Sequence, residues 1–189
     1  MATTVCSPSV TVEGGRNLHR SAPTHPVNEL RAARRDLLAT LQGCTAADLL
    51  RPGVEGDWCA RDVLLHIAAW LRELACLVPD LATYGYQRGA AGDPGPDWVA
   101  WRTVRPEAAV AGVVTAHARL LETVAGLNDA GLRRRGPTRF GFVTSGWDLL
   151  MAEAAHEREH AARLAVHTRR PALALNAPCR PPGPVLRAG

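Results

Sequence analysis

The sequence predicts an all-α protein, a four-helix bundle with a long connection between its second and third helices. Four stretches of the chain carry apolar residues at the three- and four-residue spacing of an amphipathic helix. Proline and glycine separate these stretches, and the chain shows no convincing strand pattern and no internal repeat. With 189 residues, of which 47% are hydrophobic, the chain is large enough for one domain with a buried core.

The first helix is expected over residues 26–42. Pro26 suits the first helical position, and Gly43 suits the stop. The apolar stripe of this helix consists of Leu30, Ala33, Leu37, Leu38 and Leu41. A short helical turn is expected from Thr45 to Asp48, which have the spacing of a capping box with Asp in place of Glu.

The second helix is expected to begin near Cys59 and to end before Pro79, because proline disrupts a helix interior. Its inward stripe consists of Val63, Ile67, Trp70, Leu71 and Leu74. At about 100° per residue, His66 falls roughly 40° from Trp70 and roughly 60° from Val63. His66 is therefore expected at the margin of the buried stripe and not on the solvent face.

A long connection is expected over residues 84–104, which are rich in Gly, Asp and Pro. A connection of this length in a compact domain is usually functional or mobile. Residues 97–102 are expected to form a short helix within it. Its aromatic residues are Tyr84, Tyr86, Trp98 and Trp101.

The third and fourth helices follow the connection. The third is expected from Pro106 to about Leu127, with apolar positions at Val110, Val113, Val114, Ala118, Leu120, Leu121 and Val124. The fourth is expected to start after Ser145, a suitable N-cap, with Asp148 three residues on as the capping carboxylate. Its helical pattern continues to about Thr168.

The two ends of the chain differ in composition from the helical part. Residues 1–24 mix Ser, Thr, Pro and Gly without periodicity and are interpreted as a disordered leader. Residues 171–189 are interpreted as a proline-rich tail, so the helical domain spans residues 25–170. The start shows no signal-peptide pattern, and no apolar run approaches the roughly 20 residues that cross a bilayer. We therefore expect a cytoplasmic protein without a membrane partner.

Charge and cysteine content exclude two further classes. All 22 basic residues are arginine, and the formal net charge is +4. Their single cluster, Arg133 to Arg135, lies in an expected loop without interleaved aromatics, whereas a nucleic-acid site needs a basic face or stripe. No nucleic-acid partner is expected. The five cysteines are odd in number and include no Cys-x-x-Cys pair, so reduced thiols are expected.

Three histidines predict a metal site inside the bundle. His156 and His160 lie four residues apart on the last helix, and residues at this spacing share one helix face. Ala152 and Ala155 are small and leave room beside them, and His66 on the second helix supplies a third imidazole. Three imidazoles with an open fourth position form a catalytic zinc arrangement, and nickel or ferrous iron would also accept them.

The residues around the histidine pair also fit other interpretations. Glu157, Arg158 and Glu159 surround the pair, as they would on a solvated helix face. The segment from His156 to His160 matches the zinc-protease motif His-Glu-x-x-His, but no Asp or Glu follows it and no strand is expected to align a peptide. The motif does place Glu157 near enough to a metal-bound water to act as a base.

Two segments of the chain resemble the DinB/YfiT-like metalloenzyme superfamily, over roughly residues 27 to 168. The family pattern Trp-Ser-x-x-Asp-x-x-x-His at the start of the second helix is matched by Trp58, Asp62 and His66. Cys59 replaces the serine of that pattern. The family's His-x-x-x-His on the last long helix is matched by His156 and His160.

The resemblance implies a four-helix bundle that holds a divalent metal and often forms a homodimer. Family members include transferases and isomerases that use mycothiol or bacillithiol, and hydrolases. The maleylpyruvate isomerase branch commonly has a glutamate at the position of His156, so that reaction is not assigned here. A self-resistance branch opens strained rings of genotoxic natural products.

We therefore expect a metal-dependent enzyme that activates a low-molecular-weight thiol, such as mycothiol, or water for attack on an electrophilic small molecule. Zinc is the first choice of metal. The alternatives are a hydrolase or sequestering self-resistance protein for a reactive natural product, and a non-catalytic protein that binds a small molecule. The residues expected to line the pocket or to pair with a substrate carboxylate are Trp58, Trp101, Tyr84, Tyr86, Arg102 and Arg158.

Overall fold

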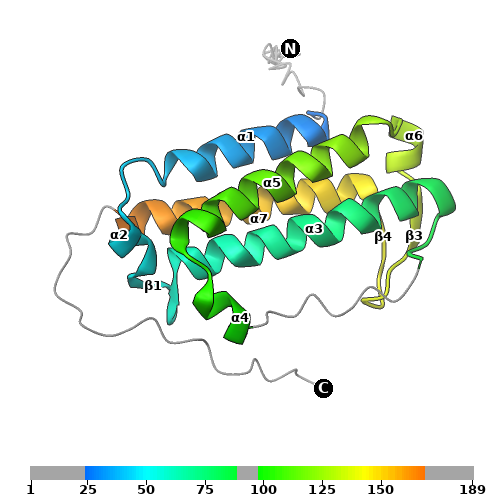
Figure 1. Cartoon of the computed structure of the whole chain (residues 1–189). Helices are drawn as coiled ribbons and strands as arrows, with labels where there is room; N and C mark the ends of the chain where they lie inside the picture. Colours follow the sequence, from blue (N-terminus) through cyan, green and yellow to red (C-terminus); the bar gives the residue numbers. More distant parts are fainter. Residues whose placement is uncertain (1–23, 89–97, 169–189) are drawn as a thin grey trace, which may run out of the picture.

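Four long helices lie side by side and form the body of the protein (Figure 1). The computed structural model describes residues 24–88 and 98–168. α1 packs along α7, and α3 packs along both α5 and α7. The prediction of an all-α bundle is confirmed. The four helices are α1 (Pro26–Ala39), α3 (Ala60–Tyr84), α5 (Pro106–Ala125) and α7 (Gly146–Thr168).

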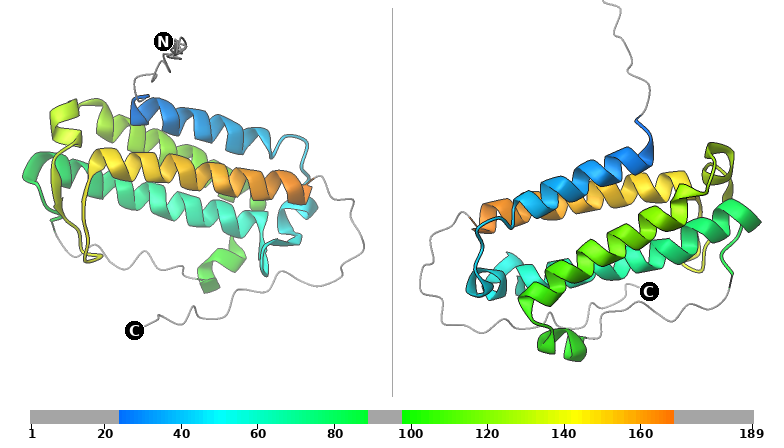
Figure 2. Two further views of the ribbon diagram at one scale, coloured as in Figure 1. Left: turned by 180° about the vertical axis from the view of Figure 1, so that it is seen from behind. Right: turned by 45° about the horizontal axis from the view of Figure 1, so that its top comes forward.

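The direction of the helices explains the long connection. α1 and α7 run one way along the bundle, and α3 and α5 run the opposite way (Figures 1 and 2). Because α3 and α5 are parallel neighbours, the chain must return along the bundle between them. The short helix expected over residues 97–102 is α4 (Trp98–Thr103), and it lies beside the start of α3, where Arg61 Nη1 donates to the Arg102 carbonyl oxygen at 3.3 Å.

Some predictions fall on segments outside the described residues. These segments are residues 1–23, 89–97 and 169–189. They include nearly all of the expected leader, part of the long connection and the expected tail.

The core is built from the inward faces of the long helices. Leu30, Ala33 and Leu37 of the predicted α1 stripe are fully buried. The short helix α6 (Asp129–Leu132) adds Leu132 to the same core. Among the described helices, α5 alone is long and apolar enough to meet the length and hydropathy criteria of a membrane span. In the structure α5 packs along α3, as a core helix of a bundle does.

α3 does not end before Pro79, as the sequence predicted, but continues to Tyr84. Proline removes one backbone donor from a helix interior and crowds the preceding turn. Leu77 and Leu81, on either side of the proline, are buried in the core, and this burial offsets the lost hydrogen bond. Gly85 ends the helix in the left-handed conformation, with φ of 77°.

Two short antiparallel hairpins, for which the sequence shows no convincing strand pattern, flank the bundle. Their strands have two to four residues, which is too short for an alternating pattern to show in the sequence. One hairpin precedes α3 and the other precedes α7. The pairs are β1 (Pro52–Glu55) with β2 (Trp58–Cys59), and β3 (Arg135–Pro137) with β4 (Val143–Ser145).

Two helix starts are capped as the sequence predicts. At α2 (Ala46–Leu50), the Thr45 N–H donates to the Asp48 carboxylate at 2.9 Å, and the Asp48 N–H donates to Thr45 Oγ1 at 3.2 Å. At α7, the Asp148 N–H donates to Ser145 Oγ at 3.1 Å. These contacts satisfy backbone donors that a helix start leaves free.

Candidate metal centre

Three histidine rings converge between α3 and α7. His66 comes from α3, and His156 and His160 lie one turn apart on α7. Nε2 of His156 lies 3.2 Å from Nε2 of His66 and 2.9 Å from Nε2 of His160. The structure thus brings together the three histidines that the sequence selected, from segments 90 residues apart.

The spacing of the three nitrogens fits a single divalent ion. Ligand atoms of all three side chains lie within 4.8 Å of one another. Two imidazole nitrogens bound to one tetrahedral zinc, each at about 2.1 Å, would be about 3.4 Å apart. His66 and His156 are half-buried and His160 is buried, so small molecules can reach the first two rings.

Two carboxylates face the other ring nitrogens of the α7 histidines. Nδ1 of His156 lies 3.2 Å from a carboxylate oxygen of Glu153, one turn earlier in α7. Nδ1 of His160 lies 3.3 Å from a carboxylate oxygen of Glu55, at the end of β1. The hydrogen bond to Glu153 favours the His156 tautomer whose Nε2 lone pair is free for a metal, whereas the Glu55–His160 contact is an ion-pair distance without hydrogen-bond geometry. The sequence analysis missed Glu55, because only the β1–β2 hairpin brings it to α7.

The surroundings keep two of the three imidazoles neutral. Burial, and then the charges of the neighbouring histidines, lower the pKa of His66 to about 4. Burial, and then the charges of His156 and Arg163, lower the pKa of His160 to about 4. Burial also acts to lower the pKa of His156, but the hydrogen bond and charge of Glu153 outweigh it and raise that pKa. The neutral imidazole is the form that binds a metal.

Glu157 has a different environment from the histidines beside it in sequence. Its side chain is fully buried, and neither carboxylate oxygen has a hydrogen-bond partner among the described residues. Burial, and then the charge of Glu153, raise the pKa of Glu157 to about 8 against the opposing charges of Arg34 and Arg158. The general-base role that the sequence suggested for Glu157 stays a prediction, and a carboxyl pKa raised toward neutral pH is compatible with it.

The predicted pocket residues in β2 and α4 lie at the same end of the bundle as His66. The Trp58 ring meets the His66 ring edge-on, with centroids 5.4 Å apart. Trp101 is half-buried against the core. The Arg102 side chain is exposed. Trp58 is therefore in direct contact with the histidine site.

The remaining predicted pocket residues lie away from the histidines. Tyr84 and Tyr86 are at the other end of α3, about 27 Å from His66 at the rise of an α-helix, and are 46% and 51% exposed. Arg158 pairs with Glu29 of α1 across the α1–α7 interface. The structure therefore does not bring these three predicted residues to the site.

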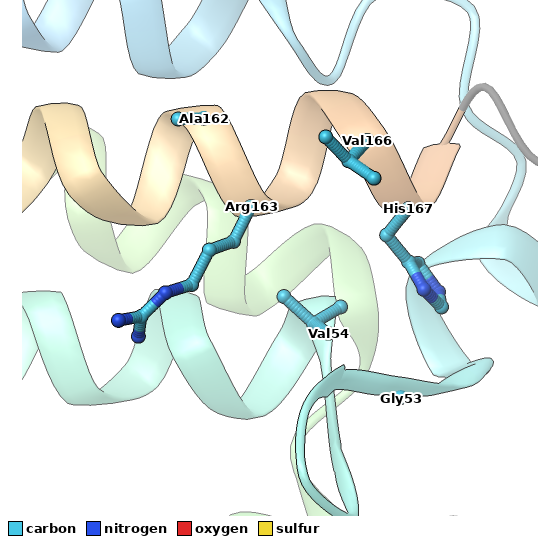
Figure 3. Close-up of a pocket in the computed structure, with 6 residues that line it drawn as sticks. All are labelled: Gly53, Val54, Ala162, Arg163, Val166 and His167. Carbon is cyan, nitrogen blue, oxygen red and sulfur yellow. The ribbon is translucent and has the colours of Figure 1, made fainter.

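A pocket of about 310 Å³ lies between β1 and the last turns of α7 (Figure 3). Arg163 forms part of its lining and pairs with Glu55, the carboxylate that faces His160. The Arg163–Glu55 pair therefore links the pocket lining to the histidine site. The lining residues are Gly53, Val54, Ala162, Arg163, Val166 and His167.

Parallel and antiparallel long helices that gather three histidines place the chain among helical bundles with a candidate metal site. The family model of the DinB superfamily matches residues 29–164. The chain therefore belongs to the DinB superfamily.

The fold is similar to that of mycothiol-dependent maleylpyruvate isomerase. Two crystal structures, of this enzyme and of a histidine-to-alanine mutant of it, align with TM-scores of 0.62 and 0.61. Each alignment has 15% sequence identity and covers 74% of this chain and 59% of the isomerase chain. At this identity the likeness shows a shared fold, and the chain spans about three fifths of the isomerase. No curated protein matches the chain significantly by sequence.

Proposed function

We propose that this protein is a metal-dependent enzyme that activates a low-molecular-weight thiol or water for attack on an electrophilic small molecule. The main support is the convergence of three Nε2 atoms from α3 and α7, two of them backed by carboxylates. Three imidazole nitrogens with one accessible side are typical of a catalytic metal site.

The residues of the site have separate parts in this proposal. A divalent ion, zinc first and nickel or ferrous iron as alternatives, would supply a Lewis acid that lowers the pKa of a thiol or water. His66, His156 and His160 would hold the ion. Glu153 accepts a hydrogen bond from His156 Nδ1 and so orients that ring, and the Glu55 carboxylate lies 3.3 Å from His160 Nδ1.

The thiol is proposed to be mycothiol or a similar cosubstrate. The structural likeness to an isomerase whose name states its dependence on mycothiol supports this choice. We do not propose maleylpyruvate as the substrate, because His156 stands where the resembling isomerase branch commonly has glutamate. The proposal further includes a cytoplasmic location, and a homodimer as the resemblance implies.

Loss of metal on mutation tests the ligand assignment. His66→Ala, His156→Ala and His160→Ala should each abolish retention of one metal equivalent and leave the helix content near wild type. His167→Gln is the matched control, because it changes a histidine of the same helix outside the site and should keep the metal. Metal per chain after dialysis and far-ultraviolet circular dichroism are the measurements. A triad variant with a full equivalent at unchanged affinity would show that the assignment is wrong.

Turnover of a simple epoxide by the metal-loaded protein tests the chemistry. Consumption of styrene oxide should require both the metal and an added thiol. Turnover without thiol would instead indicate the hydrolase. A protein that holds no metal and binds small molecules without turnover would be the non-catalytic binding protein.

A further inference from the structure

Three aromatic side chains outside the metal centre form one surface. Trp70 belongs to α3, and Phe140 and Phe142 belong to the turn between β3 and β4. The Phe140 ring centroid lies 5.9 Å from that of Trp70 and 6.1 Å from that of Phe142, with the two phenylalanines stacked at 16°. Phe140 and Phe142 are 39% and 48% exposed. We call these three residues the aromatic wall.

The aromatic wall is continuous with the histidine site along one face of α3. His66, Trp70 and Glu73 recur at intervals of four and three residues, so they share a face of the helix. Trp70 follows His66 by one turn, about 6 Å along the helix axis. A molecule whose reacting atom lies at the histidines therefore has Trp70 and Phe140 within reach of its next ring.

A polar network fixes the turn that carries the phenylalanines. The guanidinium of Arg139 lies 2.9 Å from the carboxylate of Glu73, whose side chain is 6% exposed. Gln87 Nε2 donates to Glu73 at 3.2 Å, and the Arg139 N–H donates to Gln87 Oε1 at 3.0 Å. Arg139, the residue before Phe140, is thus held by Glu73 of α3 and by Gln87, which keeps Phe140 beside Trp70. A preformed apolar surface loses little freedom when a ligand binds to it.

We propose that the aromatic wall is the subsite for a flat aromatic group of the electrophile. Large exposed rings on an anchored turn, one helix turn from the reacting centre, favour a ligand that stacks on them over a flexible aliphatic one. The inference rests on the proposed function and names the class of its substrate. It also assigns the aromatic contact to Trp70, Phe140 and Phe142, and not to the distant Tyr84 and Tyr86.

Binding of two matched probes to the zinc-loaded full chain tests the inference without requiring turnover. 2-Naphthol and 2-decalol share one carbon skeleton, but only 2-naphthol is flat and aromatic. Wild type should bind 2-naphthol more tightly in isothermal titration calorimetry. Phe140→Leu and Trp70→Leu should each weaken 2-naphthol binding about three- to tenfold and change 2-decalol binding less than twofold.

The control is the double variant Tyr84→Leu with Tyr86→Leu, which removes an exposed aromatic pair far from the histidines and should leave both affinities unchanged. Equal affinity of the wild type for the two probes would overturn the inference. So would an unchanged 2-naphthol affinity in Phe140→Leu, which alters an exposed side chain and should fold normally.

Metal content separates the two proposals. Metal without a preference for 2-naphthol contradicts this inference alone, and the preference without metal contradicts the proposed function alone.

Discussion

At the scale of single residues, two glutamates one turn apart on α7 show how surroundings decide a role. Glu153 and Glu157 are 5% and 0% exposed, and burial raises the pKa of both. The hydrogen bond between Glu153 and His156 lowers the pKa of Glu153 and so offsets part of the rise that burial causes. Glu157 has Arg34 and Arg158 as nearby opposite charges instead. Residue type and spacing do not distinguish the two side chains, but their contacts do.

Glu153→Gln should weaken metal binding, because the neutral amide makes the His156 imidazole a poorer ligand. The expected loss of affinity is roughly 10- to 100-fold, with helix content unchanged. Competition with a chromophoric chelator measures it. Glu122→Gln, an exposed position on α5, is the control and should keep wild-type affinity. Equal affinities in the two variants would show that the Glu153 carboxylate does not orient His156.

His117 should make the protein less stable in mild acid. Its side chain is 2% exposed, and its Nε2 lies 3.3 Å from the Leu30 carbonyl oxygen. Burial, and then the charge of Arg34, lower the pKa of His117 from 6.5 to about 4. Between these values the unfolded chain binds the extra proton, so the free energy of unfolding falls as the pH falls. The stability that depends on His117 staying neutral is fully present above pH 6.5.

The variant His117→Gln isolates this effect, because it keeps an N–H donor but does not titrate. Relative to this variant, wild type should lose up to about 1.4 kcal/mol per pH unit between pH 6.5 and 4. Urea unfolding at several pH values measures the difference. Parallel pH profiles for the two proteins would contradict the assignment.

At the scale of elements, the start of α3 shows a cap that the sequence only partly reveals. Cys59 stands at the N-cap, and its N–H donates to the Asp62 carboxylate at 3.2 Å. The other oxygen of Asp62 accepts from Arg61 Nη2 at 2.9 Å. Both side chains of this ion pair are nearly buried. The carboxylate therefore fixes the helix that carries His66 and also balances a buried charge.

Asp62→Ala should destabilise the fold by about 3 kcal/mol, because a buried arginine loses its carboxylate and α3 loses its cap. The matched control is Asp48→Ala at the exposed capping box of α2, with an expected cost of about 1 kcal/mol or less. Chemical denaturation measures both. Equal stability of the two variants would show that the buried Arg61–Asp62 pair does not contribute to the stability of the fold.

The hairpins and Pro79 show where element prediction failed. β1, β2, β3 and β4 are stabilised by contacts with the bundle, and strands this short carry no periodic signal of their own. The proline rule describes an isolated helix, whereas α3 is held from Leu77 to Leu81 by a core that continues on both sides. Local propensity is overridden in both cases by tertiary burial.

At the scale of the whole molecule, the histidine site lies between α3 and α7, which run in opposite directions along the bundle. His66 belongs to α3, which packs on α5, and the other two histidines belong to α7, which packs on α1. An ion held by all three side chains would link these two pairs of helices. Binding of such an ion would therefore raise folding stability, since a ligand that binds only the folded state stabilises it.

Zinc at about 100 times its dissociation constant should stabilise the fold by about 2.7 kcal/mol and raise the Tm by roughly 5 to 10 °C. Thermal unfolding with zinc and with a chelator measures the shift. The His156→Ala variant should show no such shift. Equal Tm values of the wild type under the two conditions would contradict a metal shared by α3 and α7.

The sequence by itself determined the helices, their caps and the three histidines, because these depend on spacing within one segment of chain. Periodic burial gave the helix faces, and a four-residue interval put two imidazoles side by side. Tertiary structure decided which side chains surround them. Glu55 reaches His160 through the β1–β2 hairpin, and Phe140 reaches Trp70 through the β3–β4 hairpin. Such neighbours are set by contacts between distant segments, for which local spacing holds no information.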